Sequence, residues 1–394
     1  VQPPDGNHLE ESGGDGGMKW EKKKLCECTE YITDGDHQPA PKADKGVHFI
    51  KIKDIVNNQV SFDAQVYVPQ EYYDNLPMER KPQKEDVLYT IVGSFGIPSY
   101  VQTDELFCFE RNIALLHPNK DIEPRFLYYS LKNPAFYKGV EIVANGSAQK
   151  LIPLSKLKDL KILVPDKEAQ RHIADILSAY DDLIENNQRQ IKLLEEAAQR
   201  LYKEWFVDLN FPGHENTKIV DGVPEGWSRG LLKELISVNY GKDHKKAPDD
   251  GNIPVYGSGG LMRKCNKSLF SGEAVLIPRK GSLNNIMYVD ETFWTVDTMF
   301  YATMKQPHTA VFVYFFVKAF DMYSMNIGAA VPSMTTKILD AMDVVIPDKE
   351  TLEKFDKLTK TYFNKIKTLQ GQNERLKIAR DLLLPKLMSG EVEV

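Results

Sequence analysis

Two stretches of the chain place apolar residues at alternating steps of four and three positions, which is the 3.5-residue spacing of a coiled coil. In the first stretch these positions are Ile173, Leu177, Tyr180, Ile184, Asn187, Ile191, Leu194, Ala198, Leu201 and Trp205. Adding 182 to each number gives a weaker series in the same phase: Phe355, Thr359, Tyr362, Ile366, Leu369, Asn373, Leu376, Arg380, Leu383 and Leu387. Each stretch is therefore predicted to form a long helix, over about 166–210 and 348–394.

The segments outside these helices also repeat. Residues 146–168 align with residues 328–350 without a gap, at the same offset of 182. An offset of 207 pairs Trp20 with Trp227 and Asp36-His37 with Asp243-His244, and an offset of 188 pairs Val87-Leu88 with Val275-Leu276 and Gly93-Ser94 with Gly281-Ser282. Offsets that drift in this way indicate two copies of one fold with loops of different length.

The predicted fold class is α+β, with two pseudo-repeated α/β domains separated by two long antiparallel helices that resemble a coiled coil. We expect the first domain at 18–165 and the second at 211–347. Residues 1–17 are acidic and rich in glycine, and are expected to be a disordered tail or a remnant of cloning. Pro165-Asp166 and Pro347-Asp348 open the helices, where Asp is a natural N-cap.

Each apolar seam contains one asparagine. If the two copies are related by a pseudo-twofold, the helices are antiparallel about positions 189 and 371, and Asn187 lies opposite Asn373. A buried Asn pair fixes the register of a coiled coil, because a shifted alignment leaves its amides unpaired. The alternative is that both side chains reach water at the edge of the helix pair.

The composition is that of a globular protein, with 42% apolar and 27% charged residues in 394. The net charge of −6 falls mainly on residues 1–17 and 166–210, so it neither supports nor opposes DNA binding by the two domains. No run of about 18 uncharged apolar residues and no secretory signal are present, so a cytoplasmic protein without a membrane partner is expected. The four cysteines have neither disulfide nor zinc spacing, and no metal site is predicted.

Several of these segments resemble the specificity subunit of Type I restriction–modification systems. Asn145-Gly-Ser-Ala-Gln149, with the strand from Ile162 to Pro165, is similar to the end of a target-recognition domain of that family. Leu177 to Asn187, Leu201 to Asp208 and Leu383 to Glu391 resemble its shared helical regions, and Val223-Pro-Glu-Gly-Trp227 resembles the entry to its second domain. The resemblance extends over nearly the whole chain from Met18.

The resemblance implies a DNA-binding subunit that reads a split, asymmetric target on double-stranded DNA, one half per domain. It also implies docking of two methyltransferase subunits, and restriction or translocase subunits in the full complex. It implies no catalytic site and no cofactor in this chain, since S-adenosylmethionine would bind the methyltransferase. Independently, a helix of about 35 residues is roughly 50 Å long, enough to hold two readers about one DNA turn apart.

Candidate DNA contacts lie in polar loops beside the repeated positions. His37 and His244 precede repeated Ala-Pro pairs, and Ser94 and Ser282 follow repeated glycines; each set fits DNA contact or a role within its own loop. The amide side chains of Asn145 and Gln149, just before the last predicted strand of the first domain, could pair with adenine or could cap a turn. The lysines and arginines that follow or lie near His244 and Ser282 in the sequence could neutralise DNA phosphates or could only be solvated. The full set of candidates is His37, Gln38, Lys42, Ser94, Asn145, Ser147, Gln149, Lys150, Lys242, His244, Lys245, Lys246, Arg263, Lys264, Arg279, Lys280 and Ser282.

The sequence also bears on two other classes of function. A stand-alone nuclease is disfavoured because Pro-Asp is here followed by a helix, without the further carboxylates and lysine on adjoining strands that metal-dependent cleavage needs. Gly257-Ser-Gly-Gly260 lacks the context of a nucleotide-binding loop. A helical assembly scaffold that does not bind DNA stays open, and the salt dependence of DNA affinity would separate it from a DNA reader.

Overall fold

The computed structural model describes residues 19–144, 150–325 and 333–394. These residues form two compact units. Unit 1 contains the described residues up to Asn186 together with Gln372–Val394, and unit 2 contains Asn187–Gly371. Each unit therefore includes part of both long helices.

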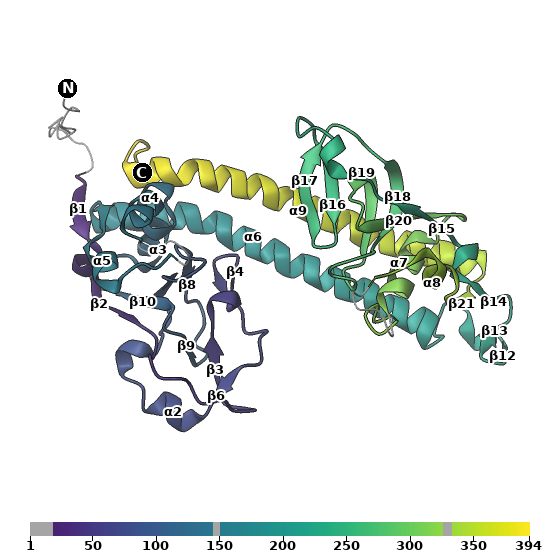
Figure 1. Cartoon of the computed structure of the whole chain (residues 1–394), viewed down its shortest axis with the longest axis horizontal. Coiled ribbons are helices and arrows are strands. Elements are labelled where there is room, and N and C mark those ends of the chain that lie inside the picture. Colours follow the sequence, from purple (N-terminus) through teal and green to yellow (C-terminus); the bar gives the residue numbers. More distant parts are fainter. Residues whose placement is uncertain (1–18, 145–149, 326–332) are drawn as a thin grey trace. The chain divides into compact units, whose positions relative to one another are not determined.

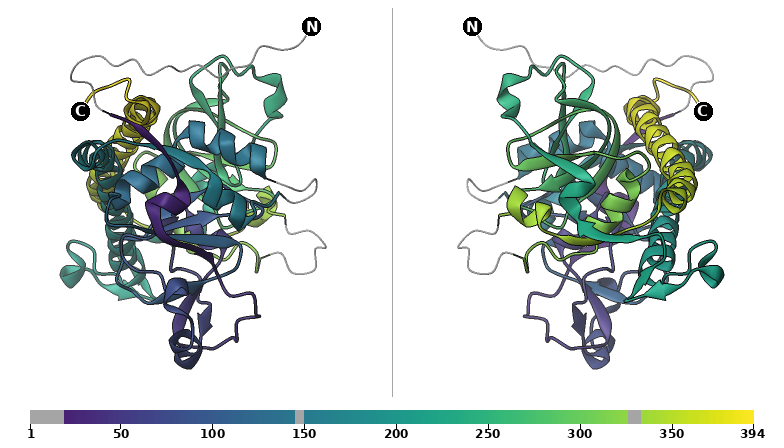
Figure 2. Two further views of the ribbon diagram at one scale, coloured as in Figure 1. Left: turned by 90° about the vertical axis from the view of Figure 1, so that its left-hand side faces the viewer. Right: turned by 90° about the vertical axis from the view of Figure 1, so that its right-hand side faces the viewer.

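The two long helices are α6 (Lys167–Tyr202) and α9 (Lys349–Ser389); both are drawn as unbroken helices in Figure 1 and are seen nearly end-on in Figure 2. Asp166 accepts a hydrogen bond from the Ala169 amide at 2.9 Å, and Asp348 from the Thr351 amide at 3.0 Å, which confirms both as N-caps. All seam positions of these two fully described helices are buried or half-buried.

Both helices end before the predicted limits. The α-helical part of the first ends at Tyr202, and one π turn (Lys203–Val207) follows it. Phe211 precedes Pro212, and a residue before proline is biased away from helical angles. The second helix ends at Ser389 because Gly390 adopts a φ of +76°, the left-handed conformation that terminates helices.

Unit 1 has its strands in a four-stranded sheet of order β2-β10-β7-β8, a three-stranded sheet of order β6-β3-β9, and the pairs β1-β11 and β4-β5. Its strands are β1 (Glu21–Lys24), β2 (Thr29–Asp34), β3 (Val47–Ile50), β4 (Ile55–Val56), β5 (Gln59–Val60), β6 (Tyr67–Val68), β7 (Val87–Thr90), β8 (Pro98–Tyr100), β9 (Phe107–Phe109), β10 (Ile113–Pro118) and β11 (Lys161–Val164). Its shorter helices are α1 (Leu25–Cys28), α2 (Gln70–Asp74), α3 (Pro124–Lys132), α4 (Pro134–Val143) and α5 (Leu154–Asp159), with 3-10 turns at Ile52–Asp54 and Met78–Arg80.

Unit 2 has a six-stranded sheet of order β15-β20-β18-β19-β16-β17 and the pairs β14-β21 and β12-β13. Its strands are β12 (Ile219–Val220), β13 (Val223–Pro224), β14 (Ser228–Leu231), β15 (Ile236–Tyr240), β16 (Ile253–Gly257), β17 (Gly260–Cys265), β18 (Phe270–Pro278), β19 (Met287–Thr295), β20 (Met299–Met304) and β21 (Asp343–Ile346). Its shorter helices are α7 (Ala310–Lys318) and α8 (Thr336–Asp340), with 3-10 turns at His214–Asn216, Leu232–Glu234 and His244–Lys246.

Strand registers confirm the internal repeat. Glu21 lies opposite Val164 in unit 1, and Ser228 lies opposite Ile346 in unit 2, as the offsets of 207 and 182 require. Likewise Leu88 of β7 pairs with Leu115 of β10, and Leu276 of β18 pairs with Tyr301 of β20. Leu88 and Leu276 are the two residues that the offset of 188 makes equivalent.

One repeated pair of helices was not predicted. Helices α3 and α7 are both nine residues long and follow equivalent strands, β10 and β20. Lys132 lies over the Tyr128 ring at 5.2 Å and Lys318 over the Tyr314 ring at 5.0 Å, so the same contact recurs in both helices. The middle of both helices is buried, and α7 is apolar around its whole circumference, as expected of helices within a core.

Within each unit the parts of α6 and α9 are antiparallel. In unit 1, Ile173 and Leu177 of α6 share an apolar cluster with Leu384 and Leu387 of α9, while Ile184 accepts a hydrogen bond from Asn373 at 3.5 Å. In unit 2, the rings of Trp205 and Phe355 lie 5.8 Å apart, the two positions that the predicted register places opposite each other. The predicted α+β fold class, with two α/β repeats and two long antiparallel helices, is confirmed.

Candidate nucleic-acid interface

In unit 1, the loops that carry the candidate DNA contacts of the first domain lie together at one edge of the four-stranded sheet. Strands β2 and β7 end at this edge and β10 and β8 begin there, because Asp34 pairs with Ala114, Thr90 with Ile113 and Tyr89 with Pro98. The loops at this edge are 35–42, 91–97 and 110–112. We call this surface edge 1.

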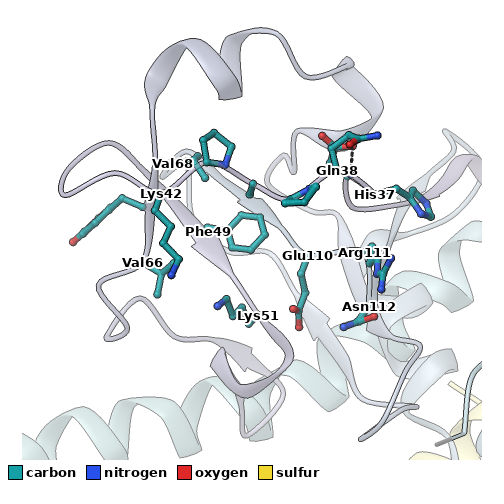
Figure 3. A pocket seen from close by; sticks show the side chains of 15 residues that line it. His37, Gln38, Lys42, Phe49, Lys51, Val66, Val68, Glu110, Arg111 and Asn112 are labelled. Atoms are coloured by element: carbon teal, nitrogen blue, oxygen red, sulfur yellow. Dashed lines mark hydrogen bonds between the residues drawn. The ribbon is translucent and has the colours of Figure 1, made fainter.

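A pocket of about 460 Å³ opens at edge 1. Loop 35–42, strands β3 and β6 and the turn after β9 line it (Figure 3), and it contains His37, Gln38 and Lys42 from the candidate set. Lys42 and Lys51 lie on one side of the pocket, and His37, Arg111 and Asn112 lie on the other (Figure 3). The parallel pairing of β3 with β9 brings these segments together.

The charges around the pocket favour an anion. Lys42, Lys51 and Arg111 have no ion-pair partner among the residues that the structure describes. The Glu110 carboxylate, by contrast, accepts a hydrogen bond from the Ile52 amide at 2.8 Å. The pocket is lined by two carboxylates as well, but Asp36 is paired with Arg80, so the three cations exceed the one remaining negative charge of Glu110. An excess of positive charge is suited to phosphate.

Asp36 shapes the loop that carries His37 and Gln38. Its carboxylate accepts hydrogen bonds from the Gln38 amide at 3.2 Å, the Tyr72 hydroxyl at 3.0 Å and the Arg80 guanidinium at 3.1 Å. Burial alone would raise the pKa of Asp36, but these hydrogen bonds and the Arg80 charge outweigh burial, and the pKa is lowered. A carboxylate held ionised in this way fixes the loop.

His37 contacts Asp34 through Nε2 at 3.0 Å, yet 59% of its side chain is exposed. The side chain thus has a partner in its own loop and one face open to a ligand. Gln38 and Lys42 are exposed in the same loop.

Ser94 and Lys150 lie close to each other at the same edge. The Gly93 amide donates to the Lys150 carbonyl at 3.2 Å, and the Ile91 amide donates to the carbonyl of the pocket residue Asn112 at 2.9 Å. Lys150 lies over the Phe95 ring at 5.5 Å. The neighbouring candidates Asn145, Ser147 and Gln149 lie outside the described residues.

The repeated glycines have a conformational reason. Gly93 has a φ of 70° and Gly281 a φ of 82°, both in the left-handed region that residues with a Cβ avoid. Each makes the tight turn that exposes the following serine, Ser94 or Ser282.

In unit 2, the candidate DNA contacts of the second domain lie at the equivalent edge of the six-stranded sheet. Strand β15 ends where β20 begins, since Tyr240 pairs with Phe300, and β18 ends where β19 begins, since Leu276 pairs with Met287. The end of β18 also lies beside the start of β20, since Pro278 pairs with Met299, so these four strand ends lie at one edge. Loops 241–249 and 279–286 lie there, and we call this surface edge 2. Its exposed candidates are Lys242, Lys245, Lys280 and Ser282. The side chain of Lys246 lies outside the described residues.

Arg263 and His244 are engaged within the protein. The guanidinium of Arg263 donates to His244 Nδ1 at 3.2 Å, to the His244 and Ala247 carbonyls, and forms an ion pair with Asp249. Arg263 thereby fastens loop 244–249 to strand β17. For His244 the structure favours the loop-stabilising alternative, and Arg263, predicted either to neutralise a phosphate or to be solvated, holds the loop instead.

Arg279 is also partly engaged. Its guanidinium donates to the Asp297 carbonyl at 3.0 Å and lies over the rings of Tyr240 and Phe300 at 5.3 and 5.5 Å. Lys264, on β17, is exposed. Edge 2 thus combines exposed lysines with arginines that order its loops.

Asn187 and Asn373 are 2% and 5% exposed. Burial of both side chains is what a register-fixing pair requires. Asn187 belongs to unit 2 and Asn373 to unit 1, and their pairing stays a prediction.

Lys51, Arg111 and Asn112 were not among the DNA contacts predicted from the sequence. Arg111 and Asn112 form the turn between two buried strands, Phe107–Phe109 and Ile113–Pro118. Two polar residues between two apolar runs are a turn signal, which could have identified them. Lys51 has no such signal, because only the long-range pairing of β3 with β9 brings it to the pocket.

Neither a metal cluster nor a membrane helix is present in the described parts of the chain. The described residues contain no group of three or more His, Cys, Asp or Glu side chains arranged to hold a metal ion. None of their helices is both long enough and apolar enough to cross a membrane.

Comparisons with known proteins agree on one family. A model described as the Type I restriction modification DNA specificity domain matches residues 18–196 and 224–377. The Type I restriction enzyme MjaIX specificity subunit of Methanocaldococcus jannaschii is 26% identical over 325 residues, which cover 72% of each chain. The HindI specificity subunit of Haemophilus influenzae is 23% identical over 449 aligned positions, covering 88% of this chain and 94% of that protein.

A solved structure shares the fold. The S subunit of a Type I restriction–modification system from M. genitalium has a TM-score of 0.63 and 19% identity, and the match covers 96% of this chain and 97% of that one. The family model covers most of the chain and matches it twice, once in each repeat. The chain therefore belongs to the Type I restriction modification DNA specificity domain family.

Proposed function

We propose that this chain reads a bipartite, asymmetric target on duplex DNA, with edge 1 contacting one half and edge 2 the other. The observation that carries the proposal is that loops with exposed cations and polar side chains gather at equivalent edges of two repeated sheets. The two edges differ in sequence, so the two half-sites differ as well.

Each edge offers both kinds of contact that a DNA reader needs. Lys42, Lys51 and Arg111 at edge 1, and Lys242, Lys245 and Lys280 at edge 2, are suited to phosphates, which position the protein without specifying sequence. Gln38, Asn112 and Ser282 can hydrogen-bond to base edges in the major groove, where each base pair presents a distinct pattern.

We also propose that the chain is not itself an enzyme and that methylation occurs in two methyltransferase subunits carrying S-adenosylmethionine, with restriction or translocase subunits in the full complex. The Pro-Asp pairs support this division. The carboxylates of Asp166 and Asp348 accept hydrogen bonds from the first turns of α6 and α9, so both serve as helix caps rather than as free metal ligands. The two long helices would act as a spacer and as the docking surface for the methyltransferases.

Affinity for random duplex DNA as a function of salt tests the DNA-binding part of the proposal. We expect a steep fall in affinity with rising salt for the full chain. The triple variant Lys42→Ala/Lys51→Ala/Arg111→Ala should weaken binding to all sequences and flatten the logarithmic salt slope by about 2.7, at about 0.9 for each phosphate that is no longer neutralised.

Lys161→Ala removes an exposed lysine of unit 1 outside the pocket and serves as the matched control. It should leave the affinity and the slope close to those of the unchanged chain. A full chain whose affinity is negligible or independent of salt would contradict the proposal and favour an assembly scaffold.

A further inference from the structure

An exposed apolar pair lies near the tip of the β16–β17 hairpin of unit 2, whose strands are labelled in Figure 1. Leu261 and Met262 are 59% and 55% exposed and adjacent in sequence. Single exposed apolar side chains are ordinary on protein surfaces, and successive residues of a regular strand point to opposite faces. Here the register shifts, so that Leu261 and Met262 lie opposite the one residue Tyr256 in a β-bulge, and the two exposed side chains offer an apolar contact at one point of the hairpin. Such a contact calls for a ligand that offers an apolar group.

The hairpin is held in place by its surroundings. The Asn285 side chain donates to the Ser258 carbonyl in the two-residue turn at 2.9 Å. A Cβ on Gly257 would lie 2.4 Å from the Met262 sulfur, so the thioether occupies space that only glycine leaves free. The turn and the Met262 thioether are therefore held in place before any ligand arrives, which lowers the entropic cost of binding.

Cations lie on the same hairpin and in the adjoining loop 241–249, part of which Arg263 fastens to it. Lys242, Lys245 and Lys264 are exposed, and none of their ammonium groups has an ion-pair partner among the described parts of the chain. Arg263, on the same strand as Leu261 and Met262, fastens loop 244–249 to the hairpin and neutralises Asp249. The β16–β17 hairpin therefore offers apolar side chains near its tip and lysines without ion pairs nearby. It complements a polyanion whose phosphates face the lysines and whose apolar groups face Leu261 and Met262.

We propose that the β16–β17 ribbon enters the DNA major groove and that Leu261 and Met262 contact the 5-methyl group of thymine. The major groove admits a two-stranded β-ribbon, and the thymine methyl is the apolar group that the bases display there. The lysines of the ribbon and of loop 241–249 contact the flanking phosphates. This inference rests on the proposed function, and it names the base feature that edge 2 reads.

Selection from random duplex libraries tests it with a probe that differs by one methyl group. The full chain selects duplexes from one library made with thymine and from a second made with deoxyuracil, which lacks only the 5-methyl. We expect an A·T preference at one position or two adjacent positions of one half-site. Preference there should fall about fourfold in the uracil library, the equivalent of about 0.8 kcal/mol for one buried methyl-sized group.

Variants assign the effect to the ribbon. Leu261→Ala/Met262→Ala should lose the preference at those positions and bind the thymine and uracil duplexes equally. Val220→Ala, which shortens another exposed apolar residue on a hairpin of the same unit, is the matched control and should keep the difference. Thermal unfolding checks that each variant is folded, and the uracil comparison with the unchanged chain needs no variant.

The outcomes separate this inference from the proposed function. A selected motif that tolerates uracil at every thymine would overturn the methyl contact and leave DNA reading intact. Libraries with no enriched sequence would overturn both. A double variant that keeps the thymine preference but changes the oligomeric state would assign the apolar pair to a protein partner and overturn the inference.

Discussion

At the residue scale, the candidate site was only partly readable from the sequence. Repeated neighbours such as Asp36-His37 and Asp243-His244 pointed to loops that the structure places at equivalent sheet edges. The pocket at edge 1 also contains Lys51 and Arg111, which are far apart in the chain and meet through a parallel strand pair. A sequence pattern records local periodicity, and it contains no direct signal for such long-range pairing.

Arg263 shows a second limit of the sequence. From the sequence, Arg263 could contact a phosphate or be only solvated, and the structure directs its guanidinium into loop 244–249. Arginine presents several donors in a fixed fork, so one side chain can hold several loop carbonyls. The number of acceptors around a cation depends on the folded loop.

Replacing Arg263 tests that assignment. Arg263→Ala should lower the free energy of unfolding by about 1–3 kcal/mol, because the acceptors of loop 244–249 lose their donors. Arg263→Lys keeps the charge but not the fork, so most of the loss should persist in urea unfolding. If Arg263→Lys restored full DNA affinity and neither variant lost stability, Arg263 would be a phosphate contact instead.

At the element scale, the sequence predicted the most. Heptad spacing located both long helices, and the repeat predicted which strands are equivalent, down to the register of β1 with β11 and β14 with β21. The short strands β3, β6 and β9 were not predicted as a separate sheet. Their runs of two to four residues are too short to show a period of two, and the sheet exists because its side chains pack with Tyr73 and Leu76.

The N-cap of α9 is tied to the domain core. Asp348 accepts hydrogen bonds from the Thr351 amide at 3.0 Å, the Thr351 hydroxyl at 2.7 Å and the Trp227 indole at 2.9 Å. Burial alone would raise the pKa of Asp348, but these hydrogen bonds outweigh it and the pKa is lowered. The folded protein therefore favours the ionised form of Asp348.

This linkage predicts a pH dependence. Because the folded pKa lies below the unfolded value of about 4, the contribution of Asp348 is present above that pH and lost as the pH falls through the folded pKa. Asp348→Asn keeps a side chain able to cap the helix but removes the titration, so its unfolding free energy should fall less between about pH 5 and pH 3. Urea unfolding at each pH measures this. Thr351→Val, which removes one donor, should give an intermediate profile, and an unchanged profile for Asp348→Asn would contradict the account.

At the scale of the whole molecule, the duplication gives each unit its own proposed DNA-reading edge. A unit contains one repeated domain, the start of one long helix and the end of the other. The two edges share architecture but not residues: Lys51 and Arg111 line the pocket at edge 1, whereas the exposed cations in the loops of edge 2 are Lys242, Lys245 and Lys280. Equivalent scaffolds with different loops are suited to two different half-sites.

Changes to the proposed base-contacting residues of one edge should therefore affect one half-site. Gln38→Ala/Asn112→Ala at edge 1 should relax base preference in one half of the selected motif, by about 1–3 kcal/mol for each bidentate pairing with a base that is removed, and leave the other half unchanged.

Lys242→Ala/Lys245→Ala at edge 2 should weaken binding to all sequences evenly. Selection from random duplexes measures both, and a change in both halves by the edge 1 variant would contradict independent reading.

The most direct test of the central claim, that two unlike edges read two unlike half-sites, is sequencing of DNA methylation in the host with this gene present and absent. The account predicts methylated adenines that depend on the gene and lie in a motif of two different halves separated by a fixed gap. Methylation unaffected by the gene, or confined to one continuous or palindromic motif, would contradict it.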